Sequence, residues 1–249
     1  MIDPRRPDSP GVARRLAGLA EKPLNFELAT LRDASAADGW EATDVCQRLP
    51  DEPPGPPVKG GCFQIARCLM RGYEFADPSI VRAYYDPDLP LERRDMLLKL
   101  RALGGLVRLF AGVRVGEVYE QTRELEGQLV HVWGWNYRTL AGHVEMGQMD
   151  WEVWKWLGNG RVEFRVHAIS RPAPIRNPIV SIGFHLLRRR ERRAFLDSTQ
   201  RRMRTFTELA LQHEGADRLV RDAAAELTAR TTRVDDPAHE AVADNIRPK

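Results

Sequence analysis

The feature that most constrains this fold is a run of alternating apolar positions near the middle of the chain. After the turn residues Gly158-Asn159-Gly160, apolar side chains occupy every second position from 162 to 168, with arginine, glutamate and histidine between them. Successive side chains of a strand point to opposite faces, so this pattern predicts a half-buried antiparallel strand. Similar runs at 113–119, 129–135 and 151–156 predict further strands, and the Gly-Asn-Gly turn predicts a hairpin. Such a sheet has an apolar face that another element must cover.

The segment after Pro174 is predicted to supply that cover. Its side chains step by three or four residues, as in a helix with one apolar stripe, at Leu196, Thr199, Met203, Phe206 and Ala210. Arginines from Arg188 to Arg204 form the remaining surface, which is a solvated face or, alternatively, a surface for phosphate, RNA or an anionic membrane. The predicted fold is α+β: a curved antiparallel β-sheet wrapped around a long C-terminal helix, with extra helices inserted after the first strands.

The first part of the chain carries mixed patterns. Residues 24–31 alternate and predict a first strand, and residues 40–49 predict a second extended run, followed by a proline-rich surface loop. Residues 61–75 fit either a strand or a helix. Helices are predicted over 77–85, where apolar side chains show a three-four spacing, and over 91–103, which has one apolar side.

The chain is expected to divide into three parts. Residues 1–22 form an N-terminal lead-in, residues 23–212 form a single α+β domain, and residues 213–249 form an accessory helix followed by a disordered tail. The accessory helix at 216–230 is expected to dock onto the domain. A contact with a second copy in a homodimer is the alternative.

Composition argues against several classes of protein. The formal net charge of +3 is too small to imply a nucleic acid partner. No apolar run approaches the roughly 20 residues that span a bilayer, and no apolar core follows the charged N-terminus. We therefore expect a cytoplasmic protein without a transmembrane segment or secretory signal. Cys46, Cys62 and Cys68 contain no Cys-x-x-Cys pair, which predicts reduced thiols, no metal site and no cofactor.

The densest concentration of reactive side chains is the stretch Gly134–Gly147. His143 and Glu145 are two residues apart, so on an extended backbone they leave the same face. A carboxylate beside an imidazole raises the imidazole pKa and fixes its tautomer, which suits a general base, and Tyr137 adds a hydroxyl donor. The glycines around this pair also indicate a turn or bulge. In that alternative the two side chains cap backbone groups or pair structurally.

Four further residues are candidates for ligand contact: Trp135, Asn136, Thr139 and Arg171. Trp135 belongs to a group of five of the six tryptophans that lies between positions 133 and 156. This group forms either an aromatic cavity wall or plain core packing. Arg171 stands where a strand ends, and its guanidinium is suited to a ligand carboxylate or phosphate. Bonding to loop carbonyls or a structural salt bridge is the alternative for Arg171.

Several of these segments carry a family resemblance. The stretch Trp133–Gly147 resembles the core motif of a bacterial family catalogued as domain of unknown function 1990. Ile169–Ala173 looks like the second motif of that family, and the arginine-rich Leu187–Phe195 is similar to its third. Leu24–Leu31 looks like its opening, so the resemblance covers roughly residues 24–212.

The resemblance implies a helix-grip fold, as in lipid-transfer, polyketide-cyclase-like and pollen-allergen proteins. That fold places an apolar cavity between a curved sheet and a long C-terminal helix. Two residues depart from the family pattern: Arg138 replaces a small residue, and Gln148 stands where an acidic residue is usual.

Three functions are considered as hypotheses. The leading one is binding of an apolar or amphipathic small molecule between the sheet and the C-terminal helix, anchored by Tyr137, Thr139, His143, Glu145 and Arg171. The second is an enzyme of cyclase or hydrolase type, in which His143 acts as general base, Glu145 orients it and Tyr137 donates to developing negative charge. The third is an interaction scaffold without a ligand, which uses its basic helix and tail.

Overall fold

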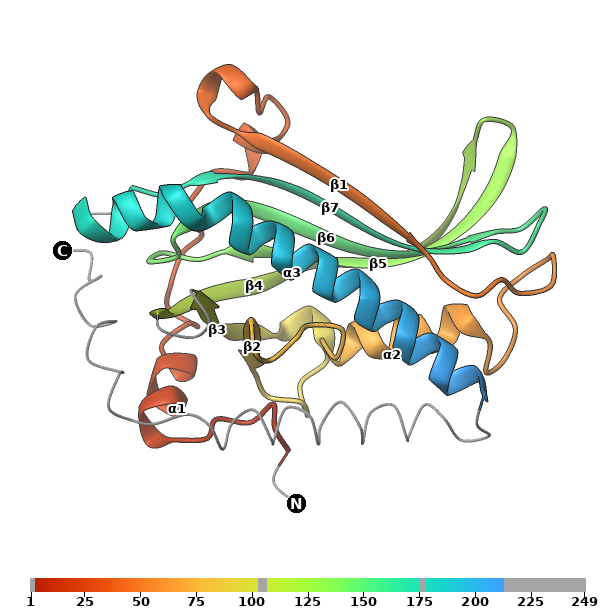
Figure 1. The fold of residues 1–249 in the computed structure, drawn as a ribbon, viewed down its shortest axis with the longest axis horizontal. Helices are drawn as coiled ribbons and strands as arrows, with labels where there is room; N and C mark the ends of the chain where they lie inside the picture. Colours follow the sequence, from red (N-terminus) through yellow and green to blue (C-terminus); the bar gives the residue numbers. More distant parts are fainter. Residues whose placement is uncertain (1–2, 103–106, 175–177, 213–249) are drawn as a thin grey trace.

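The fold is built on one seven-stranded antiparallel sheet with the strand order β1-β7-β6-β5-β4-β3-β2 (Figure 1). This computed structural model describes residues 3–102, 107–174 and 178–212. In chain order, the strands are β1 Glu41–Arg48, β2 Val81–Tyr84, β3 Asp95–Ala102, β4 Val107–Leu125, β5 Gln128–Thr139, β6 Glu145–Trp156 and β7 Val162–Pro172. The predicted strands at 113–119, 129–135, 151–156 and 162–168 are confirmed, and each is part of a longer strand.

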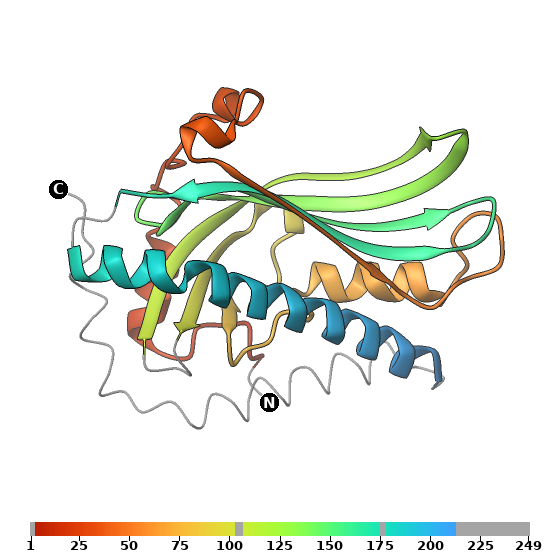
Figure 2. The same cartoon turned by 45° about the horizontal axis from the view of Figure 1, so that its top comes forward.

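A long helix, α3 Pro178–Gln212, runs along the concave face of the sheet (Figure 2). We call this the inner face. The stripe expected on the helix is confirmed, because Leu196, Thr199 and Met203 are all buried. A shorter helix, α2 Cys62–Arg71, packs beside α3 and buries six of its ten residues. The main core therefore lies between the inner face and these two helices, and the α+β class is confirmed.

A second, smaller core lies on the other side of the sheet edge. Helix α1 Pro10–Ala17 begins after Ser9, whose hydroxyl accepts the Val12 amide at 3.3 Å. Val12 and Leu19 pack there with Tyr84, Leu97 and Leu140. Three short 3-10 helices complete the described elements: η1 Leu28–Leu31, η2 Ala36–Asp38 and η3 Leu91–Arg93.

Three of the expected elements are wrong. The helix predicted over 91–103 is the short η3 followed by β3, and the helix predicted over 77–85 contains β2. The reason is that both faces of β2 and β3 are covered. Leu98 faces the main core, while its neighbour Leu97 faces the second core under α1, so the sequence lacks the alternation of a half-buried strand.

The predicted first strand at 24–31 is also wrong. Leu24 forms a single bridge with Leu140, and the chain then turns into η1. The ambiguous segment 61–75 contains a helix, and the extended run at 40–49 is confirmed as β1. The accessory helix predicted at 216–230 and the tail lie outside the described residues, and the three-part division of the chain stays a prediction.

Gly147 lets β6 pack closely beside β7. Its φ is 149°, and an added Cβ would lie 2.1 Å from the Ile169 carbonyl oxygen and 2.7 Å from the Ser170 Cα. The Gly147 amide donates to the Thr139 hydroxyl at 2.9 Å, which attaches the start of β6 to β5. Of the turn or bulge expected from the glycine pattern, the turn is present, and the pairing of β6 with β7 runs through Gly147 without a register shift.

We predict that Gly147→Ala lowers the free energy of unfolding by about 2–4 kcal/mol, because both the backbone conformation and the contact with β7 resist a side chain. Gly158→Ala is the matched control, since no atom lies within 4 Å of an added Cβ there. Its free energy of unfolding is expected to stay within about 1 kcal/mol of the wild type. Urea denaturation followed by circular dichroism measures both, and equal stability of the two variants would contradict the close contact of Gly147 with β7.

Candidate functional site

The motif stretch spans the end of β5, a turn at 140–144 and the start of β6. Tyr137 and Trp135 lie on the inner face, where they are paired across β6 with Met149 and Trp151. Asn136 stands between them in the strand, so its side chain belongs to the opposite, outer face. The sheet thus separates two groups of predicted ligand-contact residues.

His143 is a turn residue whose imidazole is already engaged. Its amide donates to the Leu140 carbonyl at 3.0 Å, and its Nδ1 accepts the Glu145 amide at 2.9 Å. Burial lowers the pKa of His143, and the Glu145 charge offsets this only in part. A neutral imidazole that accepts at Nδ1 carries its proton on Nε2. His143 therefore caps a backbone amide, which is one of the structural roles considered for the His143 and Glu145 pair.

The Glu145 carboxylate binds a helix arginine. Arg188 donates from Nε to Glu145, from Nη1 to Glu41 at 3.1 Å and from Nη2 to the Ser170 hydroxyl at 3.3 Å. Arg188 is 8% exposed, and a buried guanidinium of this kind needs such a full set of partners. The Glu145 carboxylate thus binds Arg188 and does not orient the His143 imidazole. A general base at this site would have to act through His143 Nε2 alone, and that hypothesis stays a prediction.

Arg192 lies one helical turn further along α3, on the same side as Arg188. Its Nη1 donates to the Ser170 hydroxyl at 2.9 Å, which places the guanidinium over the inner face. Its Nε and Nη2 are buried and have no hydrogen-bond partner. A buried donor left unpaired costs about 1–3 kcal/mol, and more when the group is charged. We refer to Glu145, Ser170, Arg188 and Arg192 as the polar cluster.

Three more buried polar atoms between the sheet and α3 lack a hydrogen-bond partner. They are the hydroxyl of Thr199 and the indole nitrogens of Trp135 and Trp151. The Tyr73 hydroxyl faces the Tyr137 hydroxyl. The Tyr73 ring lies 6.3 Å from Trp135 and 6.1 Å from Trp151, measured between ring centroids. Tyr137 joins this aromatic region to the polar cluster. Its ring centroid lies 6.1 Å from that of Trp135, and the charges of Glu145 and Arg192 are close enough to shift the pKa of its hydroxyl.

Tyr73 reaches this region through an unusual backbone conformation. Its φ is 57°, in the left-handed region that few residues other than glycine adopt. Burial raises the pKa of the Tyr73 hydroxyl well above its ordinary value, so the group is a neutral donor. Beside it, the Tyr137 hydroxyl donates to the Met149 sulfur at 3.3 Å, and sulfur is a weak acceptor. Burial raises the pKa of Tyr137 as well. The sheet–α3 interface thus offers neutral donors in an apolar setting.

Thr139 has a structural role. Its hydroxyl donates to the Asn25 side chain at 2.6 Å and accepts the Gly147 amide. The Asn25 amide nitrogen in turn donates to the Glu145 carbonyl at 2.9 Å. These bonds attach the N-terminal segment to the turn, so the Thr139 hydroxyl is not available to a ligand.

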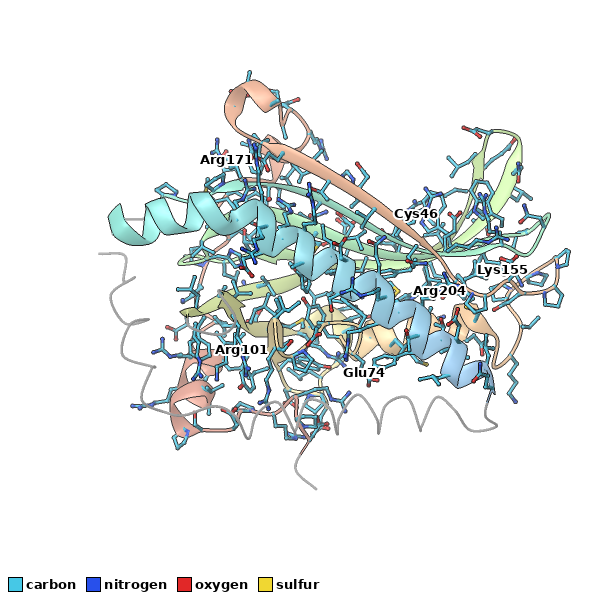
Figure 3. All side chains as sticks on the ribbon, viewed as in Figure 1. Cys46, Glu74, Arg101, Lys155, Arg171 and Arg204 are labelled. Atoms are coloured by element: carbon cyan, nitrogen blue, oxygen red, sulfur yellow. The ribbon has the colours of Figure 1, made fainter. Side chains whose placement is uncertain are left out.

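The side chains of Asn136 and Arg171 both lie on the outer face of the sheet and contact other parts of the protein there. Asn136 accepts the Glu117 amide at 3.2 Å where the register of β4 shifts. Arg171 stacks over Trp40 at 4.8 Å and donates to the Asp38 carbonyl at 3.4 Å. Figure 3 shows Arg171 at the end of the sheet where β1 begins, far from Lys155 at the opposite end. The loop-carbonyl alternative for Arg171 is the arrangement observed.

Sequence reasoning missed the importance of Ser170, Arg192 and Tyr73. For Arg192 a signal existed, because positions 188 and 192 continue the stripe of Leu196 toward the N-terminus of the helix. Two arginines on the buried side of a helix need partners or a ligand. No sequence pattern marks Tyr73, whose position depends on the left-handed turn that ends α2.

A surface pocket of about 220 Å³ lies between α2, η3 and the edge formed by β4 and β5. Two of its charged groups are paired with each other: Arg67 binds Glu120 at 3.0 Å and lies over the Trp133 ring at 5.2 Å. Across the described ranges, no group of three His, Cys, Asp or Glu side chains is arranged to hold a metal ion. None of the described helices is long and apolar enough to cross a membrane.

Comparison with known families agrees with the motifs. The profile described as Domain of unknown function (DUF1990) matches residues 27–202. The chain belongs to this family. No curated protein matches the DUF1990 chain. Among solved structures, the crystal structure of human STARD10 is similar at 10% sequence identity and a TM-score of 0.34, over 84% of this chain and 85% of that one.

The burial of neutral His143 predicts a pH dependence of stability. Its native pKa lies below the ordinary value of 6.5, so the unfolded state binds more protons as the pH falls through that value. The free energy of unfolding is therefore expected to fall as the pH drops below about 6.5. In His143→Asn, whose amide oxygen can still accept the Glu145 amide, the fall is expected to be smaller.

Urea titrations of wild type and His143→Asn at about pH 7.5 and about pH 5 measure this difference. Gly158→Ala changes no titratable group and should keep the wild-type pH dependence. An unchanged pH dependence in His143→Asn would show that the imidazole is not held neutral by burial.

Proposed function

We propose that this DUF1990 protein binds a small amphipathic molecule between the inner face of the sheet and α3. The observation that carries the proposal is the group of buried polar atoms without partners that share this interface. They belong to Trp135, Trp151, Thr199 and Arg192. Native proteins pair nearly all their buried polar groups, so a group of unpaired atoms in one interface calls for an explanation, and a bound molecule is one that fits all of them.

The surroundings of these atoms define what the ligand must look like. Trp151 packs against Phe75 at 4.5 Å and against Phe195 of α3 at 6.2 Å, so the body of the ligand meets aromatic surface. The unpaired atoms are nearly all donors, so the ligand must carry acceptors. An apolar body with a few oxygen atoms satisfies both requirements.

A cytoplasmic location is part of the proposal. No disulfide joins Cys46, Cys62 and Cys68, and burial raises the pKa of the Cys62 thiol, which keeps it protonated and unreactive. Protonated thiols fit a reducing compartment. A homodimer stays a prediction, to be measured by the mass of the native protein.

The direct test is native mass spectrometry of the protein purified from its own host. We expect a population with extra mass that is lost on collisional activation, and its exact mass identifies the ligand class. The same protein unfolded, washed and refolded is the control, and it should regain the extra mass only after incubation with host extract. Repeated absence of extra mass in both preparations would favour the scaffold hypothesis.

A pair of threonines on α3 tests whether the unpaired atoms serve binding. Thr199 and Thr207 are both fully buried, but the Thr207 hydroxyl donates to the Met203 carbonyl at 2.8 Å, whereas the Thr199 hydroxyl has no partner. Thr199→Val is expected to raise the stability of the ligand-free protein by about 0.5–1 kcal/mol, since it removes an unsatisfied group. Thr207→Val is expected to lower it by about 1 kcal/mol.

The ligand fraction seen by native mass spectrometry separates the roles further. It should fall in Thr199→Val and stay at the wild-type level in Thr207→Val. If Thr199→Val destabilises the ligand-free protein and keeps full ligand occupancy, the Thr199 hydroxyl plays no part in binding.

A further inference from the structure

The arginines of this chain show a repeated way of binding carboxylates. The Nε and Nη2 hydrogens of a guanidinium lie along one edge and fit the two oxygens of a carboxylate. Arg114 uses this edge on Asp95, at 2.7 and 3.0 Å. Arg5 uses the same edge on Asp3, at 2.8 and 2.7 Å.

In Arg192 this edge is buried and empty. The Ser170 hydroxyl holds only Nη1, on the other side of the guanidinium, and so fixes the orientation of the group. The two atoms left without a partner are Nε and Nη2, the pair that Arg114 presents to its carboxylate. Among the described residues, no carboxylate forms an ion pair with Arg192.

Other arginines, such as Arg171 and Arg202, also have a buried Nε without a hydrogen-bond partner, but among the described residues only Arg192 leaves both Nε and Nη2 unpaired. Lys155, at the opposite end of the sheet, is 0% exposed and donates to Glu52 at 2.6 Å and to the Pro56 carbonyl at 2.8 Å. Arg188, one turn from Arg192, has Glu145 and Glu41. The carboxylates near the polar cluster are thus taken by Arg188, and the charge of Arg192 is left over.

We infer that Arg192 binds the anionic head group of the ligand, a carboxylate or phosphate with two oxygens on its Nε–Nη2 edge. This inference rests on the proposed function and names its ligand class. Arg192 bonds to Ser170 of β7 and acts on the pKa of Tyr137 in β5, so its guanidinium lies over the inner face. From there the aromatic region begins: Phe195 is the next buried residue of α3, and its ring packs on Trp151.

This arrangement orients the ligand. The head group lies in the polar cluster, where Ser170 and Arg192 hold it, and the apolar body follows α3 toward Thr199. Arg188 supports the site without contacting the head group, because its own carboxylates neutralise it. Arg192 and Ser170 are therefore the residues that select an anion over a neutral molecule.

Matched probes that share one body and differ in the head group test this inference. Dodecanoate, dodecyl phosphate and dodecanol are titrated below their micellar concentrations into refolded, ligand-free protein, together with 2-naphthoate and 2-naphthol. Quenching of tryptophan fluorescence and calorimetry report binding. We expect at least one anionic probe to bind about tenfold or more tighter than the neutral probe with the same body. The stronger anion identifies the head group as carboxylate or phosphate.

Arg192→Met keeps an unbranched apolar stem and removes the guanidinium. It should weaken the preferred anion about tenfold or more and leave the neutral probe unchanged. Arg192→Lys keeps the charge without the paired donors and should recover only part of the preference. The neighbouring Arg193 is exposed, so Arg193→Met is the control and should bind like the wild type.

The outcomes separate the two proposals. If neutral and anionic probes bind wild type and Arg192→Met alike, the interface binds small molecules but Arg192 does not select an anion, and this inference is overturned. If no probe binds the wild type, the proposed function fails together with it. Circular dichroism and thermal unfolding of Arg192→Met and Arg192→Lys establish that a loss of binding is not a loss of folding, and Arg192→Lys carries the test if Arg192→Met does not fold.

Discussion

The packing of α3 against the inner face of the sheet is the interaction on which the rest of the structure depends. The sheet presents large aromatic side chains on that face, among them Trp135, Trp151 and Phe164, and each is fully buried. Burial of one such side chain contributes about 1.5–3 kcal/mol, so without the helix the sheet would expose the largest part of its stabilising surface. The helix also brings Arg188 and Arg192 into the same interface, and their buried charges need hydrogen-bonding partners.

The two ends of the interface differ in how fully their cationic side chains are paired. At the end near α2, Glu52 accepts the Phe63 amide at 2.7 Å and binds Lys155, so the proline-rich loop, the helix start and the sheet form one satisfied unit. At the other end, Arg188 is satisfied by carboxylates but Arg192 is not. Single buried Nε atoms without a partner also occur elsewhere, for example in Arg171 and Arg202. Among the described residues, only Arg192 leaves both nitrogens of its carboxylate-binding edge unpaired, and it does so where we place the ligand.

The long helix and β7 were predictable because each has one apolar face, which leaves a clear period in the sequence. β2 and β3 were not, since Leu97 and Leu98 of β3 enter two different cores and the alternation disappears. For the site, His143 and Glu145 were found as reactive side chains, but their partners were not. The close packing at Gly147, the turn and the approach of Arg188 from α3 decide those partners, and they depend on long-range contacts. Even so, the two departures from the family motif are partners: Arg138 donates to Gln148 at 2.8 Å.

The tryptophans of β6 show why the inner face is the binding side. Trp154 and Trp156 lie on the outer face, where Arg165 and Arg161 stack over their rings at 3.8 and 4.5 Å. The Trp154 indole donates to Glu152 at 2.6 Å, so its polar atom is satisfied. Cation–π stacking by arginines that are themselves paired with Glu163 closes this surface. The outer face also has an unpaired indole nitrogen, that of Trp156, whose ring lies beneath the Arg161 guanidinium. The inner face places the unpaired indole nitrogens of Trp135 and Trp151 in the same interface as the unpaired edge of Arg192. A molecule with acceptor atoms that lies against α3 would therefore satisfy several groups of the inner face at once.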